Sequence, residues 1–258
     1  MKTNSLAQTA QRFIDACRQI PFTDKPETVD LAGVLETLPH IHLDENYTLE
    51  CSTPGTGGMG GESTVYALRK GTHRPKFGEL LSIRRSSVFG DDEAETAISE
   101  LDPLSHITVE KSPEGLWEYH LLTQMWRFLP LWWHANYAEQ TYITDADAVS
   151  DIAHVTEELK KQYEDGKMYM YEFQPYGLHH ASDVENAINL TGDAMVLPSV
   201  TMVGDNGDTG EITYTYWSEW GGLTRESIIA TVMEDGQVIS MGKPRVVKLV
   251  NYECGIMF

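Results

Sequence analysis

The spacing of hydrophobic residues predicts four to five helices along the chain. In these stretches apolar side chains recur every three or four residues, which places them on one face of a helix. Ser5 and Gln8 form a capping box at the start of the first helix, and a second capping box, Ser182 with Glu185, begins the last. The predicted helices before that last one cover residues 5–20, 31–38, 91–101 and 145–164.

Alternating apolar and polar residues predict strands in much of the remaining chain. β-Branched and aromatic residues, which favour strands, dominate these runs, and turn-forming residues separate them. The aromatic-rich stretch 106–143 predicts two or three strands with a break at Pro130. The connection Glu234–Gly236 is typical of a β-hairpin. The other predicted strands are residues 47–51, 63–71, 79–89, 194–203, 211–217, 223–233, 237–241 and 245–252.

The order of these elements predicts an α+β fold. Strands arrive in runs rather than alternating singly with helices, which favours an extensive antiparallel sheet with four to five helices packed against it. No repeat, linker or charge run marks a boundary, so we expect a single domain over residues 1–258. Within it, residues 1–40 form a helical N-terminal segment, residues 46–190 are mixed, and residues 191–258 form an antiparallel meander.

The charge of the chain narrows the classes of partner. It has 39 acidic and 19 basic residues, a formal net charge of −20. Such a surface repels nucleic-acid phosphates and anionic lipids, and no cationic cluster exceeds the pair Arg84–Arg85. We therefore expect no nucleic-acid and no membrane partner, and a basic protein is the partner that the charge favours. The alternative is that the acidity only keeps the protein soluble.

The location that the sequence predicts is the cytoplasm. The N-terminus lacks the apolar stretch of a signal peptide, and the most apolar window, residues 116–133, carries charged residues and a proline. Cys17, Cys51 and Cys254 are an odd number of widely spaced cysteines, which indicates neither a disulfide framework nor a zinc site.

A glycine-rich stretch, residues 55–61, raises the question of a phosphate-binding loop. Gly55, Gly57 and Gly60 fit the spacing G-x-G-x-x-G. A dinucleotide site needs a helix after the last glycine, and a P-loop needs a lysine, whereas a strand and Glu62 follow here. We interpret the stretch as a flexible hairpin connection and expect no cofactor. Because loops on a rigid sheet often carry recognition residues, it is also the second-choice binding surface, with the candidates Gly57, Gly58 and Gly60.

Two groups of histidines suggest an alternative with a metal ion. An H-x-H pair on a strand points both imidazoles to one face, which suits zinc. The stretch "HIHLD" resembles the metal-binding start of amidohydrolase barrels over five residues, and that resemblance implies a metal-dependent hydrolase. The barrels alternate β and α units, and this chain does not. The alternative metal ligands are His40, His42, Asp44, His179, His180 and Asp183, and the preferred interpretation is that the chain holds no metal.

The first-choice binding surface lies around Trp217, Glu219 and Trp220. Paired glycines follow these residues at the end of an alternating strand, and a carboxylate between two indoles suits a basic ligand. The alternative is that both indoles belong to the core. No complete catalytic constellation is present, so the catalytic residues stay unknown and the sequence favours a non-enzyme. The expected function is a soluble, acidic, intracellular binding protein, of the immunity or inhibitor type that covers a basic partner; its oligomeric state stays open.

Overall fold

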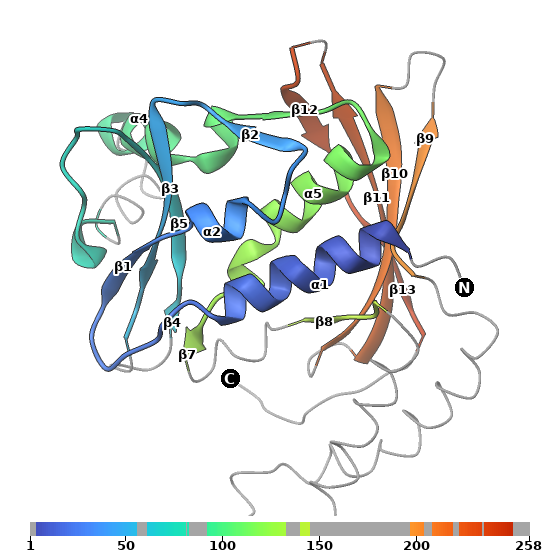
Figure 1. The fold of residues 1–258 in the computed structure, drawn as a ribbon, viewed down its shortest axis with the longest axis horizontal. Helices are drawn as coiled ribbons and strands as arrows, with labels where there is room; N and C mark the ends of the chain where they lie inside the picture. The colour runs from blue at the N-terminus through green and yellow to red at the C-terminus, as the bar shows by residue number, and fades with distance from the viewer. Residues whose placement is uncertain are drawn as a thin grey trace, which may run out of the picture.

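The computed structural model describes residues 4–55, 61–80, 82, 92–132, 140–144, 197–203, 208–218, 222–233 and 235–249. Their helices and antiparallel sheets confirm the predicted α+β fold. In Figure 1 two helices lie side by side between an N-terminal sheet and a C-terminal sheet. These central helices are α1 (Ser5–Arg18) and α5 (Pro113–Thr123). The expectation of one domain over the whole chain stays a prediction.

Helix α5 lies within the stretch 106–143, for which the sequence predicted two or three strands and no helix. Three short strands are present there, at Ile107–Val109, Leu131–Trp132 and Thr141–Tyr142, but the prediction missed the helix between the first two. Ser112 caps the helix by accepting a hydrogen bond from the Gly115 N–H (3.0 Å), and Pro113 stands in its first turn, where its missing N–H costs nothing. Every residue from Gly115 to Leu122 is buried. A helix that is covered on all sides needs no polar face, so the 3.6-residue period is missing from its sequence.

The N-terminal cap of helix α1 lies one residue earlier than the sequence predicts. The capping side chain is Asn4, whose Oδ1 accepts hydrogen bonds from the N–H groups of Leu6 (3.0 Å) and Ala7 (3.2 Å). The predicted cap, Ser5, is instead the first helical residue. The two central helices are joined by the Trp117 indole, whose Nε1 donates to the Leu6 carbonyl at 2.8 Å.

The N-terminal sheet is antiparallel and has the strand order β1-β3-β5. Its strands β3 and β5 confirm two of the predicted strands. Two small two-stranded sheets lie beside it, β2 with β6 and β4 with β7. The bounds are β1 Glu27–Asp30, β2 Ile41–Leu43, β3 Tyr47–Thr53, β4 Gly61–Glu62, β5 Thr64–Arg69, β6 Ile107–Val109 and β7 Leu131–Trp132.

The C-terminal sheet confirms the predicted meander. Its order is β12-β11-β10-β8, with β13 also paired to β11 and β9 also paired to β10. The predicted hairpin between β11 and β12 is present: the Met233 N–H donates to the Gln237 carbonyl (2.7 Å), and Gly236 has a φ of +84°. The bounds are β8 Thr141–Tyr142, β9 Ser199–Val203, β10 Thr209–Ser218, β11 Gly222–Val232, β12 Val238–Met241 and β13 Arg245–Lys248.

The remaining helices differ in how well the sequence predicts them. Helix α4 (Asp92–Leu101) matches its prediction, whereas α2 (Ala32–Leu35) is a single turn of the predicted 31–38. The strand predicted at 79–89 is wrong where it can be checked, because residues 77–80 are helical. Two short 3-10 helices, η1 (Pro103–His106) and η2 (Met125–Arg127), follow α4 and α5.

Two predicted helices, 145–164 and the one that begins at Ser182, lie outside the described residues. Among the helices that are described, none has the length and apolar character needed to cross a bilayer.

A continuous core joins the central helices to both sheets. From α1 and α5 it contains Phe13 and Trp117, each fully buried, and from the two sheets it contains Leu49 and Ile212. Phe128, just after η2, packs edge-on against the Phe13 ring, with 6.1 Å between ring centroids. The core therefore holds the end of α5 and the start of η2 in fixed positions beside β5, where the candidate site lies.

Candidate functional site: an apolar pocket at the edge of β5

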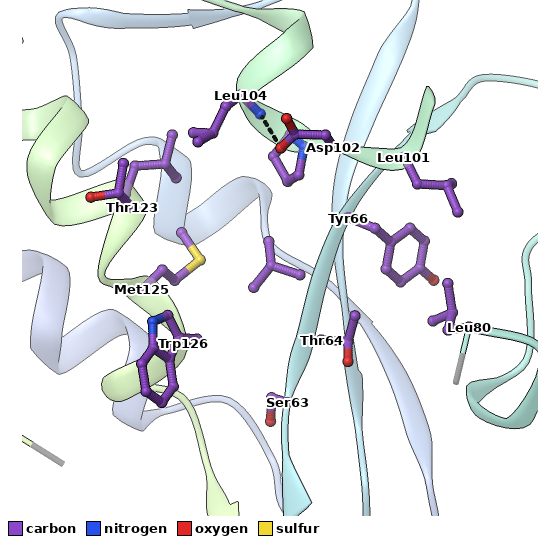
Figure 2. Close-up of a pocket in the computed structure, with 13 residues that line it drawn as sticks. Ser63, Thr64, Tyr66, Leu80, Leu101, Asp102, Leu104, Thr123, Met125 and Trp126 are labelled. Atoms are coloured by element: carbon purple, nitrogen blue, oxygen red, sulfur yellow. Dashed lines mark hydrogen bonds between the residues drawn. The ribbon is translucent and has the colours of Figure 1, made fainter. Parts of the chain in front are cut away.

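A pocket of about 650 Å³ lies where β5, the α4–η1 connection and the α5–η2 connection meet (Figure 2). Its volume falls in the range of pockets that hold a small molecule or a few side chains of a partner. Most of the lining is apolar. The apolar lining residues are Val65, Leu80, Leu101, Pro103, Leu104, Leu122 and Met125, and the aromatic ones are Tyr66 and Trp126.

The edge position of β5 lets the pocket reach both faces of this strand. Successive side chains of a strand point to opposite faces. Figure 2 shows Ser63 on the side of Met125, and Tyr66 on the opposite side with Leu80 and Leu101. Among the described strands β5 is the last of its sheet, so a ligand in the pocket would be placed to contact its backbone as well as its side chains.

Three polar side chains that line the pocket have hydrogen-bond partners within the protein. Ser63 Oγ donates to the Pro130 carbonyl (2.8 Å), and Thr123 Oγ1 donates to the His120 carbonyl (2.7 Å). Asp102, the only charged residue among those that line the pocket, caps η1 by accepting a backbone N–H at 3.1 Å. These groups stabilise the pocket walls and are not arranged as a nucleophile with a base.

The Tyr66 hydroxyl also has a hydrogen-bond partner within the protein. It donates to Glu50 Oε2 at 3.0 Å, and Arg74 Nη2 donates to Glu50 Oε1 at 2.8 Å. Burial, followed by the hydrogen bond to Glu50, raises the pKa of Tyr66 well above its ordinary value. The phenol is therefore neutral at physiological pH and acts as a structural donor to a carboxylate that is only 2 % exposed.

A second polar network lies deep between α5 and the C-terminal sheet. His120 Nε2 is 3.1 Å from the Tyr142 hydroxyl, while Tyr214 and Tyr216 both donate to Glu226 (2.5 and 2.7 Å). Burial lowers the pKa of His120 to about 3. An imidazole with that pKa takes up no proton at neutral pH, so it is poorly suited to act as a general base. The network fixes the aromatic rings of the core.

The predicted histidine ligands at the start of β2 each contact a carboxylate rather than one another. His40 Nδ1 lies 2.7 Å from Glu118 Oε1, and His42 Nε2 lies 3.2 Å from Glu110 Oε1. Asp44 accepts hydrogen bonds from the backbone and side chain of the nearby Asn46, which lowers the pKa of its carboxyl group. In the part of the chain that the structure describes, no three His, Cys, Asp or Glu side chains are placed to hold a metal ion.

The first-choice binding surface is described only at Trp217. This residue lies on β10, half-buried, opposite Leu223 of β11 and Thr141 of β8. The other candidates lie outside the described residues, and for them the binding and metal hypotheses stay predictions. They are Glu219, Trp220, Gly57, Gly58, Gly60, His179, His180 and Asp183.

The glycine-rich stretch, the second-choice surface, is described only at its two ends, and one of these ends leads to the pocket. Gly55 has a φ of +69°, and a Cβ there would lie 2.7 Å from the Lys25 carbonyl carbon. Gly61 begins β4, which pairs with β7, and Ser63 two residues later lines the pocket. The sequence did not single out the pocket-lining residues themselves. No sequence pattern marked these residues, because one wall of the pocket is α5 and its sequence lacks the period of a helix.

No protein-family model, no curated protein and no solved structure matches this chain. The class of protein is therefore defined by its own structure: an α+β fold with two helices between two antiparallel sheets and an apolar pocket at the edge of one of them.

Proposed function

We propose that this chain is a non-catalytic binding protein whose partner is a basic protein, in the manner of an immunity or inhibitor protein. The observation that carries the proposal is the pocket beside β5: its walls are mostly apolar, and the hydroxyl groups of Ser63, Tyr66 and Thr123 in them are hydrogen bonded within the protein. Such a pocket gains free energy by burying apolar groups of a partner, and it lacks groups that would react with them.

The charge around the pocket supports a basic partner. Among the residues that line it, Asp102 is the only charged one, and the exposed Glu79 and Glu100 stand next to two lining leucines. With a net charge of −20 on the whole chain, this surface would attract a cationic partner over a distance and speed its encounter.

The experiment is affinity capture with the tagged chain, followed by binding of the purified captured protein in isothermal titration. We expect a basic protein whose affinity falls at least about tenfold with Thr64→Trp, because an indole on β5 occupies part of the pocket and costs more than about 1.4 kcal/mol of binding. The matched control is Thr201→Trp, at an exposed position on β9, which should bind like the wild type.

The proposal fails if no captured protein binds after purification, or if the purified chain holds a metal ion and hydrolyses a substrate. Elemental analysis checks the second outcome. One equivalent of zinc or manganese, lost in His179→Ala, would favour the metal-dependent hydrolase that the histidines suggest.

A further inference from the structure

The direction of backbone hydrogen bonds shows which groups of β5 face the open edge of its sheet. In an antiparallel pair, residues alternate between those that bond to the neighbouring strand and those that point away from it. The Lys70 N–H donates to the Asn46 carbonyl (2.7 Å), and the Leu31 N–H donates to the Leu49 carbonyl (2.9 Å). Leu49 lies opposite Ala67, so both hydrogen bonds indicate that the backbone groups of Ala67, and of residues two positions apart from it on β5, point away from β3. The N–H and C=O of Val65 therefore point away from β3.

Val65 is the point at which this edge is open. It is half-buried and lines the pocket, and its backbone groups have no hydrogen-bond partner among the residues that the structure describes. On one side of it along the strand, Ala67 is only 1 % exposed. On the other side, Gly61 and Glu62 already pair with β7. Unpaired backbone groups beside an apolar pocket are what an added strand needs.

The pocket and its rim indicate the chemistry of that strand. An added strand places alternate side chains on the two faces of β5, where it would meet Met125 on one side and Leu80 on the other. Both neighbours favour apolar side chains. The acidic residues Glu79, Glu100 and Asp102 favour lysine or arginine before or after these apolar residues in the added strand.

We propose that a short extended segment of the partner adds as a strand to β5 at Val65, in line with β7, with apolar side chains in the pocket and basic residues on either side. The proposal rests on the proposed function and adds to it the mode of recognition. Main-chain hydrogen bonds would fix the segment, and the pocket would select its side chains.

The probe is the acetylated and amidated peptide Lys-Lys-Val-Phe-Val-Lys-Lys, measured by fluorescence anisotropy at constant ionic strength. Two analogues keep its charge: one carries an N-methyl group on Phe, and the other carries N-methyl groups on both Val residues. In an added strand, either the Phe N–H or the Val N–H groups face β5, because alternate residues point in opposite directions. Methylation therefore removes a main-chain hydrogen bond in only one analogue, and the two analogues should differ by about tenfold or more in affinity. Amide NMR should show Val65 shifting with saturation.

Variants of the protein provide the second arm. Val65→Pro removes the outward N–H, a change that an edge strand tolerates, and should weaken the parent peptide about tenfold. If that variant unfolds, Thr64→Trp tests the pocket alone, with Thr201→Trp as its matched control. Equal affinity of both analogues and the parent would overturn strand addition, even if a basic partner binds elsewhere. A dimer seen in sedimentation that Val65→Pro disrupts would overturn it too, because a second copy of the chain would then occupy this edge.

Discussion

At the scale of single residues, one buried carboxylate joins the start of β2 to the central helix. Glu118 is 1 % exposed, and it accepts hydrogen bonds from the His40 backbone N–H and from His40 Nδ1, both at 2.7 Å. The hydrogen bond to Glu118 raises the pKa of His40 above its ordinary value, against the opposing effect of burial. The stabilisation by this charged pair is therefore lost as the pH rises through the raised pKa of His40. It is also lost in acid, because burial raises the pKa of Glu118 and the pair needs an ionised carboxylate.

Glu118→Gln should lower the free energy of unfolding by about 1–3 kcal/mol at pH 6, because it removes a charged acceptor from a buried hydrogen bond. The difference from the wild type should shrink as the pH rises through the pKa of His40. Urea unfolding at several pH values measures both effects. The matched control is Glu114→Gln on the same helix, half-buried, which should change stability by less than about 0.5 kcal/mol. Equal effects of the two variants would contradict this account.

His120 should make the protein sensitive to acid. Its pKa is lowered to about 3, chiefly by burial, while an unfolded histidine titrates near pH 6.5. Between these values only the unfolded state binds the proton, so the free energy of unfolding should fall by up to about 1.4 kcal/mol per pH unit as the pH drops from 6.5 towards 3. His120→Phe keeps an aromatic ring in the core and should lose this part of the slope. A variant with the wild-type slope would show that His120 is not the group responsible.

At the scale of elements, helix α5 shows where sequence patterns lose their power. The strands β10 and β11 alternate visibly, because one face of the sheet packs against the core and the other does not. Helix α5 has no such contrast, and only the local signal Ser112-Pro113 marks its start. The pocket wall formed by α5 and η2 was therefore unpredictable from periodicity, whereas the wall formed by β5 was not.

Two helical glycines offer a matched test of the packing at α5. A Cβ on Gly115 would lie 2.2 Å from the Glu110 carbonyl oxygen, whereas a Cβ on Gly33 of α2 meets nothing within 4 Å. Alanine favours a helix over glycine by about 1 kcal/mol. Gly33→Ala should therefore stabilise the protein slightly, and Gly115→Ala should destabilise it by more than about 1 kcal/mol, as overpacking does. Thermal unfolding of both variants measures these changes in stability. A Gly115→Ala variant that is more stable than the wild type would contradict the close approach of Gly115 to the Glu110 carbonyl.

At the scale of the whole molecule, composition predicts the sign of a partner's charge but not the place where such a partner would bind. The net charge of −20 is visible in the sequence, and so is the C-terminal meander. The pocket depends on segments that converge from residues 63–66, 101–104 and 122–126, and no local pattern reports such convergence. The first-choice surface at Trp217 and the pocket beside β5 belong to different sheets, so mapping can tell them apart.

Binding of the basic partner should depend on salt. Raising sodium chloride from about 0.05 to 0.5 M shortens the Debye length, so it should slow association much more than it changes dissociation. Surface plasmon resonance at several salt concentrations separates the two rates. An association rate that does not change with salt would mean that the charge of the chain serves solubility rather than recognition.

The most direct test of the central claim is backbone amide hydrogen exchange, measured on the chain alone and saturated with its purified partner. Exchange should slow in β5 around Val65 and at η2, which both line the pocket, and should stay unchanged on the outer strands β12 and β13. Slower exchange confined to the C-terminal sheet around Trp217, with β5 unchanged, would place the partner elsewhere and contradict the account.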